Sequence, residues 1–404
     1  MKKILIFSEA ASLAHVIRPL ALLEQIDQNE FEVIVAISTN YFWLAKKNAS
    51  KLIPLKSQSP EHYESKLKKG DALFSEKVIK EYVEEDLKII KEHKPDLVIS
   101  DFRLSLNISC ELLKIPYVNI NDAHWYPTKE NITYPMPTLP ITHRLPIPLS
   151  QLFFNILSPF FIQTHINPYL KVRTFYNLKN DGINLKSFYC KSDLTFFSSY
   201  KILYEHMTFD DKCLFVGYLP IDFPVELPLW WEESMEKIKK HQSVYLTMGS
   251  TGSVKDIERL IQSLLELEVV VFVSTANRMT IKQTHPMLYT HNYLPGDLLV
   301  KHIDLMVCHG GTMTAQQALS QGVPILAIPH NMDQYFFSER IRSYKAGEVI
   351  RSDRISRSKI KETVRKILDD KTYKSQALKI KEEAVLLKKE VNINKYLKKL
   401  MSKK

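Results

Sequence analysis

The sequence predicts an α/β protein with two Rossmann-like domains, each a doubly wound parallel sheet, facing each other across a cleft. Three observations lead to this fold class. Short apolar runs alternate with helical segments in the first half, the same alternation repeats in the second half, and 404 residues are enough for two domains. Strands that alternate with helices build parallel sheets through right-handed crossovers.

The expected strands are short apolar runs, which are typical of strands buried on both faces of a sheet. They cover residues 3–7, 32–37, 97–100, 117–120, 244–248, 269–273, 305–308 and 323–328. We expect a loop at residues 8–13, a helix at 19–25, and a second helix at 312–321 that Gly322 ends.

The chain divides at a proline-rich segment that ends in a pair of tryptophans. We expect a first domain over residues 1–219, a linker over 220–240, a second domain over 241–380 and a basic helical tail over 381–404.

The composition is that of an ordinary globular protein, and it suits the cytoplasm. The start of the chain resembles a signal peptide, but Glu9 interrupts the apolar run after a few residues, so a buried strand is the better interpretation. No apolar run reaches the length of a transmembrane helix. The four cysteines have no metal-ligand spacing and suit a reducing compartment: Cys110, Cys190, Cys213 and Cys308.

The net charge of +10 is concentrated near the C-terminus. Residues 371–404 contain eleven lysines and three glutamates, a net charge of +8. The rest of the chain is close to neutral, which argues against a nucleic-acid binder with a basic groove. Two interpretations of the tail stay open: a solvated helix, or a patch that makes peripheral contact with an anionic membrane at its inner face.

A strand–turn–helix unit in the second half has the features of an anion site. The strand at 305–308 runs into His309-Gly310-Gly311, and a helix begins at Thr312. The N–H groups of this turn and of the first helical residues, Met313 and Thr314, would point at a bound anion, and the helix dipole adds to the attraction.

A carboxylate and an amide follow the next buried strand. Asp333 and Gln334 come after the strand at 323–328, and ligands of open α/β sheets bind at the carboxyl ends of strands. A diphosphate at the His309 turn would therefore place sugar hydroxyls near Asp333 and Gln334. The pattern indicates a nucleotide-linked sugar.

This region resembles the donor-binding signature of the family 1 glycosyltransferases, which have the GT-B fold. The family signature consists of aromatic-x-Pro, His-x-Gly, Glu, Gly-Val-Pro and Asp-Gln. The corresponding residues here are Tyr293-Leu294-Pro295, His309-Gly310-Gly311, Gln317, Gly322-Val323-Pro324 and Asp333-Gln334.

The chain departs from the signature at three points. It is about two residues shorter between Tyr293 and His309. Met313 stands where the family usually has Gly or Asn, and Gln317 replaces the Glu that binds the nucleotide ribose. An amide bonds a ribose diol more weakly than a carboxylate does.

The resemblance also implies roles for two residues outside this turn. Tyr293 would stack on the base, which contributes on the order of 1–3 kcal/mol. Ser250, in a Gly-Ser turn after the strand at 244–248, would meet the phosphates.

A second part of the resemblance lies after the first strand. The run Ala14-His15-Val16-Ile17-Arg18-Pro19-Leu20 is similar to the family's Gly-His-x-x-Pro-x-Leu, with Ala14 in place of glycine. The resemblance implies that His15 is the catalytic base and that Asp101, after the strand at 97–100, holds its ring in one tautomer. Taken alone, Asp101 would be a helix cap.

Two segments of the first domain have a less specific pattern. Residues 121–148 are rich in proline and aromatic residues, which favours a binding loop. Residues 149–170 are strongly apolar. We expect them to form the core face of a helix; the alternatives are the wall of an apolar acceptor pocket or a contact with a membrane surface.

Together these features imply an inverting glycosyltransferase that uses a nucleoside-diphosphate sugar, with UDP favoured, and a small or lipophilic acceptor. The nucleotide sugar is a co-substrate, and no cofactor or metal is expected because the chain has no Asp-x-Asp triplet. Two alternatives stay open: another GT-B enzyme, such as a membrane-docking N-acetylglucosaminyltransferase, and an inactive GT-B binding protein, which the residues Ala14, Met313 and Gln317 would fit.

Overall fold

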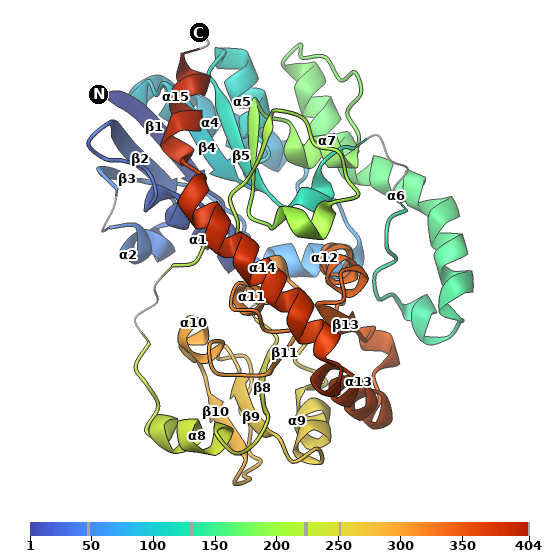
Figure 1. Ribbon diagram of the computed structural model, residues 1–404. Coiled ribbons are helices and arrows are strands. Elements are labelled where there is room, and N and C mark those ends of the chain that lie inside the picture. The colour runs from blue at the N-terminus through green and yellow to red at the C-terminus, as the bar shows by residue number, and fades with distance from the viewer. Residues whose placement is uncertain (47–48, 129–132, 222–224, 250–251, 403–404) are drawn as a thin grey trace.

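The computed structural model describes residues 1–46, 49–128, 133–221, 225–249 and 252–402, which form two domains with one parallel sheet each (Figure 1). In this part of the chain the first sheet has seven strands in the order β3-β2-β1-β4-β5-β6-β7. Their bounds are Lys2–Ser8, Phe31–Ile37, Lys51–Pro54, Leu97–Asp101, Tyr117–Asn121, Leu194–Phe197 and Cys213–Phe215 for β1 to β7.

The second sheet has six strands among the described residues, in the order β10-β9-β8-β11-β12-β13. Their bounds are Ser243–Thr247, Val270–Ser274, Leu288–His291, Leu305–Cys308, Ile325–Ala327 and Gly347–Val349 for β8 to β13. All paired strands are parallel in both sheets. The predicted α/β class with two Rossmann-like sheets is therefore confirmed.

The strands that the sequence did not predict lie mostly at sheet edges. β3, β7, β10 and β13 are the outermost strands of their sheets. An edge strand is only partly buried and needs no continuous apolar run, so its sequence resembles that of a loop. Two edge strands have such loop-like sequences. The strand β7 has three residues, and the strand β3 begins with a lysine and ends with a proline.

Helices connect the strands and cover both faces of each sheet (Figure 1). In the first domain they are α1 Leu13–Leu23, α2 Phe42–Ala45, α3 Pro60–Lys69, α4 Glu76–His93, α5 Leu106–Leu113, α6 Ile147–Phe175 and α7 Leu185–Cys190. In the second they are α8 Trp231–Ile238, α9 Ile257–Leu265, α10 Gly296–Leu299, α11 Thr312–Leu319, α12 Met332–Ser343 and α13 Arg357–Asp369.

The helix α1 begins six residues earlier than predicted, so His15 lies in its first turn and not in a loop. Pro19 suggested a helix start, but it lies inside the helix. It also follows His15 by four residues, whereas the proline of the family pattern follows the histidine by three. A proline has no N–H to donate to the carbonyl four residues earlier. That carbonyl, of His15, instead faces the Ser8 hydroxyl at 3.4 Å.

The predicted core helix at 149–170 is real but only half of it is core. In α6, Ile166, Tyr169 and Val172 are buried in the first domain. The first half, up to Phe161, carries exposed Leu, Ile and Phe side chains. The expectation of a single core face is wrong here because apolar residues occur all around this helix, and one helix face cannot bury them all.

The basic C-terminal segment forms two helices that return to the first domain. α14 (Lys371–Glu390) crosses the molecule, and α15 (Ile393–Met401) ends near the N-terminus (Figure 1). The apolar side of α15, Ile393, Leu397 and Met401, packs into the core of the first domain. No helix among the described residues is both long and apolar enough to cross a membrane.

A buried ion cluster joins the loops that follow β1 and β4. Arg103 Nη1 donates to Glu9 at 3.0 Å, Arg103 Nε donates to Asp86 at 3.0 Å, and the guanidinium stacks 3.6 Å from the centre of the Tyr82 ring. Burial raises the pKa of Glu9 and of Asp86, while Arg103 acts to lower both. The cluster fixes the two loops next to His15 and Asp101.

We expect Arg103→Met to destabilise the fold by about 3–5 kcal/mol, because it leaves two carboxylates buried without a cation. Urea unfolding measures this change. Arg259→Met is the matched control, since Arg259 forms an exposed pair with Asp256 that contributes at most about 1 kcal/mol. Equal effects of the two substitutions would show that the cluster does not support the fold.

Candidate active site

Both predicted histidines lie at the topological switch points of their sheets. In the first sheet the strand order reverses between β1 and β4; His15 follows β1, and Asp101 ends β4. In the second sheet it reverses between β8 and β11, which are followed by Gly249 and His309. Ligands of doubly wound sheets bind at these points.

The two switch points open into one shared cavity of about 450 Å³ between the domains. This volume is that of a typical small-molecule site. Nine of the predicted site residues line the cavity: His15, Asp101, His309, Gly311, Thr312, Met313, Thr314, Asp333 and Gln334. The structure therefore brings together most of the residues that the sequence singled out.

Three of the remaining predicted residues lie elsewhere. Gly310, Tyr293 and Gln317 are not in the cavity wall. Gly310 has a positive φ of 77°, and a Cβ there would meet the Ser338 hydroxyl. The Tyr293 side chain is half exposed. Ser250 lies outside the described residues.

His15 and Asp101 form the predicted pair. His15 Nδ1 lies 2.8 Å from Asp101 Oδ1, and the carboxylate is almost completely buried. Because a carboxylate can only accept, the proton is on Nδ1 and the lone pair is on Nε2. The imidazole can therefore take a proton from a hydroxyl group through Nε2.

The buried Arg18 shares Asp101 with His15. Its Nη2 donates to Asp101 Oδ1 at 2.9 Å, and its Nη1 donates to Asp122 Oδ2 at 3.0 Å. The carboxylates of Asp101 and Asp122 raise the pKa of Arg18 although burial opposes them, so it stays charged. Arg18 fixes the position of the Asp101 carboxylate and also neutralises part of its charge. This reduces the electrostatic stabilisation that Asp101 can give to a protonated His15 ring.

A strained residue supports the His15 ring. Phe102, directly after Asp101, has a φ of 59°, which is uncommon for a residue with a large side chain. Its ring stacks on the His15 imidazole, with centroids 4.3 Å apart and planes 8° from parallel. Such strain persists only where the surrounding structure imposes it. The hydrogen bond to Asp101 and the Phe102 ring thus hold the imidazole from two sides.

On the other side of the cavity, glycines enclose the His309 ring. A Cβ at Gly249 would lie 2.7 Å from His309 Cε1, and one at Gly252 would lie 2.6 Å from His309 Cβ. A Cβ at Gly311 would also collide with the ring. Any larger residue at these positions would displace the imidazole.

Two buried polar atoms at this turn have no hydrogen-bond partner among the described residues: His309 Nδ1 and Thr312 Oγ1. Buried polar groups normally have partners, so these atoms indicate a site for a polar ligand. Burial lowers the pKa of His309 to about 4, and Arg278 contributes. His309 is therefore neutral near pH 7 and can contribute a hydrogen bond to a diphosphate, but not a full charge.

We expect His309 to make the fold less stable in acid. Its pKa of about 4 in the folded state lies below the ordinary value of 6.5, so the unfolded chain binds the proton first as the pH falls. Stability is lost between pH 6.5 and pH 4, by about 3 kcal/mol from this group. His309→Gln should remove this component, and the exposed His62→Gln should not. Identical acid dependence in wild type and His309→Gln would contradict the pKa.

Comparisons with known proteins point in one direction. Residues 258–400 match the family described as "Erythromycin biosynthesis protein CIII-like, C-terminal domain". The chain is 28% identical over 379 residues to a PGL/p-HBAD biosynthesis rhamnosyltransferase from Mycobacterium bovis (strain BCG / Pasteur 1173P2), covering 94% of this chain and 83% of that protein. The calicheamicin glycosyltransferase CalG4 has a TM-score of 0.71 at 15% identity and covers 100% of this chain and 99% of its own.

The chain is a glycosyltransferase of the GT-B fold, and it is similar to the family 1 glycosyltransferases. A further similar structure is the spinosyn rhamnosyltransferase SpnG complexed with thymidine diphosphate, with a TM-score of 0.64 at 15% identity and 96% of both chains covered. The sequence-based prediction of a GT-B glycosyltransferase is thereby confirmed.

In this glycosyltransferase the side chain of Asp333, which belongs to the second domain, is hydrogen-bonded to residues of the first domain. Its Oδ1 accepts from His124 Nε2 at 2.9 Å and from Trp125 Nε1 at 2.7 Å, while 42% of its side chain is exposed. Burial acts to raise the pKa of Asp333, but the bonds from His124 and Trp125 and the charges of His124 and Arg18 together outweigh it, and the pKa is lowered to about 2. The neighbouring Gln334 accepts from the N–H of His330 with its side-chain oxygen.

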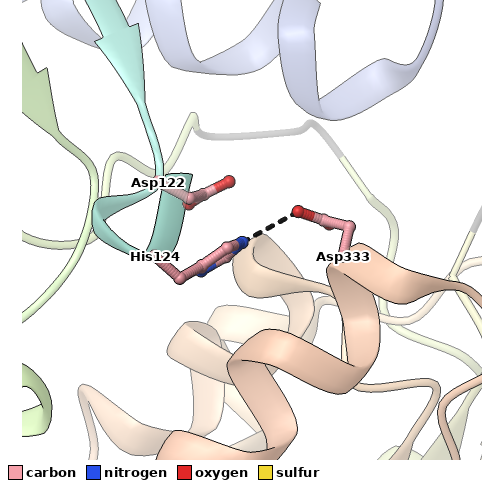
Figure 2. A group of neighbouring side chains, drawn as sticks. All are labelled: Asp122, His124 and Asp333. Atoms are coloured by element: carbon pink, nitrogen blue, oxygen red, sulfur yellow. Dashed lines mark hydrogen bonds and ion pairs between the residues drawn. The ribbon is translucent and has the colours of Figure 1, made fainter. Parts of the chain in front are cut away.

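Asp122, His124 and Asp333 have the spacing of metal ligands, with their ligand atoms within 4.8 Å of one another. Figure 2 shows His124, beyond the end of β5, pointing at Asp333 on α12, with Asp122 beside them. The donor set does not fit a cation well. Arg18 already occupies one oxygen of Asp122 and brings its own positive charge, and Trp125 donates to Asp333. These three residues instead link the two domains, through the bond between His124 and Asp333.

The sequence analysis assigned no individual role to four side chains at the site: Arg18, His124, Trp125 and Arg278. His124 and Trp125 do lie in the segment 121–148 that it predicted as a binding loop. Arg18 is three residues after His15 on the same helix, a spacing that places both on one face. His124 and Trp125 follow the carboxyl end of the strand β5, where functional residues of such sheets occur. Arg278 donates to the Gly249 carbonyl at 3.2 Å. It lies in a loop with no pattern that could have revealed it.

Proposed function

We propose that this glycosyltransferase transfers a sugar from a pyrimidine nucleoside-diphosphate sugar to a hydroxyl of a lipophilic acceptor, with inversion at the anomeric carbon and without a metal ion. The observation that carries the proposal is the placement of the two switch-point histidines, one per domain, in a single cavity. His15 serves the acceptor, and His309 serves the donor.

On the donor side, the diphosphate binds at the start of α11. The unpartnered His309 Nδ1 and Thr312 Oγ1 and the N–H groups of residues 311–314 contribute hydrogen bonds. Fixed dipoles of this kind stabilise the charge that develops on a leaving group. Because His309 is neutral, the backbone dipoles provide most of this stabilisation.

The sugar lies toward Asp333, whose carboxylate is ionised and partly exposed in the cavity wall. His124 and Trp125 hold one oxygen of Asp333, which leaves the other oxygen to accept from a sugar hydroxyl. Asp122 Oδ1, buried in the same wall and without a partner among the described residues, is a second acceptor for a hydroxyl.

On the acceptor side, His15 Nε2 removes the proton of the attacking hydroxyl. The hydroxyl oxygen forms a bond to the anomeric carbon as the bond from that carbon to the diphosphate oxygen breaks, and the electron pair leaves with the diphosphate. Attack from the face opposite the diphosphate inverts the anomeric carbon. The cavity wall near His15 is largely apolar and includes Phe102, Phe161 and Ile162, which suits a lipophilic acceptor.

A thermal-shift series tests the donor. The sequence favours UDP, and the thymidine diphosphate in the similar spinosyn rhamnosyltransferase favours dTDP, so both nucleotides and their sugars are compared with ADP and inorganic diphosphate. We expect UDP or dTDP to raise Tm, because a ligand that binds only the folded state stabilises it. Equal shifts with UDP, dTDP, ADP and inorganic diphosphate, or no shift with UDP and dTDP at millimolar concentration, would contradict the proposal.

A further inference from the structure

The first half of α6 presents an apolar stripe to solvent. Its members recur at helical spacing on one side: Leu152, Phe153, Ile156, Leu157, Phe160 and Phe161. Ile156 is 66% exposed and Phe160 is 71% exposed. Figure 1 shows this part of α6 at the right edge of the molecule, outside both sheets. We call these six side chains the α6 face. A contiguous exposed apolar surface marks a site of interaction.

The α6 face continues into the active-site cavity. Phe161 belongs to the stripe and also lines the cavity, together with Phe154, Ile162 and His165 on the neighbouring side of the helix. From α3, Leu67 is exposed and lines the same cavity. The helix α6 is thus a partition between the surroundings and the acceptor side of the cavity.

Within the segment that carries the α6 face the charges have one sign, while the exposed Asp71 in the cavity wall pairs with Lys66. Residues 131–180 contain no Asp or Glu. Exposed Arg144 precedes α6, exposed Lys171 and Lys179 lie at its other end, and Lys69 is exposed on α3 next to the cavity mouth. Basic side chains next to an apolar surface complement the negative potential of anionic lipid headgroups.

We propose that the α6 face inserts into the headgroup region of an anionic lipid membrane and orients the cavity mouth toward it. The apolar side chains enter the lipid, and Arg144, Lys171, Lys179 and Lys69 contact the anionic headgroups. A lipophilic acceptor then reaches His15 along α6 without crossing water; this delivery, unlike the docking itself, rests on the proposed function. The basic tail is a separate surface, because the apolar side of α15 is already packed on the first domain.

Vesicle flotation of the full-length protein tests the docking without any donor or acceptor. We expect binding to phosphatidylcholine vesicles that contain phosphatidylglycerol, weaker binding to phosphatidylcholine alone, and release by salt. The double substitution Ile156→Gln/Phe160→Gln should lower the partition onto anionic vesicles at least about tenfold, because two inserted apolar side chains are lost.

The matched control is Val385→Gln/Leu386→Gln on α14, where two exposed apolar residues lie away from α6. It should bind vesicles as the wild type does. Nucleotide thermal shifts of all variants verify that the fold and the donor site are intact, so that failure of docking is distinguished from failure of the proposed function.

Three results would overturn the proposal. The first is equal vesicle binding by wild type and the α6 double variant. The second is no binding by the folded wild type. The third is a wild-type dimer in light scattering that the α6 substitutions convert to a monomer, because the α6 face would then be covered by a second copy of the chain.

Discussion

His15→Ala should lower the rate of sugar transfer by about 10²–10⁴-fold, the usual effect of removing a general base. Donor affinity should stay unchanged, because the donor residues around His309 belong to the other domain. The folded structure should also persist, because the partners Asp101 and Arg18 still pair with each other. The measurement is the single-turnover rate with donor and acceptor, together with the melting temperature of the same sample.

Asp101→Asn is the companion variant. The amide can donate to His15 Nδ1, which favours the wrong tautomer, and it weakens the contact with Arg18. The combined variant should be little slower than His15→Ala alone, since the two residues act as one unit. Additive losses would show that Asp101 acts independently of His15. A normal rate for folded His15→Ala would mean that another group is the base.

His309→Ala should lower kcat/KM by about 10²–10³-fold, the effect of losing one hydrogen-bond donor to a developing charge, or about 2–4 kcal/mol. The physical reason is that Nδ1 has no protein partner among the described residues, and the neighbouring Gly249, Gly252 and Gly311 have no side chains that could replace the ring. The exposed His241→Ala in the same domain is the control. Unchanged kinetics of His309→Ala would remove His309 from the donor site.

The sequence predicted the site best where topology decides the position of a residue. His309 and Asp333 follow buried strands, and the carboxyl ends of parallel strands must meet at one edge, so their convergence needed no tertiary information. The same holds for His15, which comes after β1, and for Asp101, which ends the adjacent strand β4. Apolar runs located these strands because they are central and buried.

Contacts between the two domains could not be predicted in this way. The bonds from His124 and Trp125 to Asp333 join residues more than two hundred positions apart, and no local pattern encodes such pairs. The return of α15 to the first domain is of the same kind. Its charge left a solvated helix and a membrane contact open, and its buried Leu397 adds a structural role that only the packing shows.

The helix α6 shows a different limit of sequence analysis. An apolar segment predicts burial, but it does not say whether protein or lipid provides the apolar environment. Residues 149–161 have the composition of a core and the exposure of a surface. The described part of the chain leaves most of these side chains exposed. Residues 131–180 contain no Asp or Glu, and this feature of the sequence fits the proposed anionic membrane.

Nucleotide affinity measured on His15→Ala and His309→Ala separates the roles of the two switch-point histidines most directly. Isothermal titration with UDP and dTDP should give wild-type affinity for His15→Ala and clearly weaker affinity for His309→Ala. Loss of nucleotide binding in His15→Ala with full binding in His309→Ala would contradict the division of the site into a catalytic first domain and a donor-binding second domain.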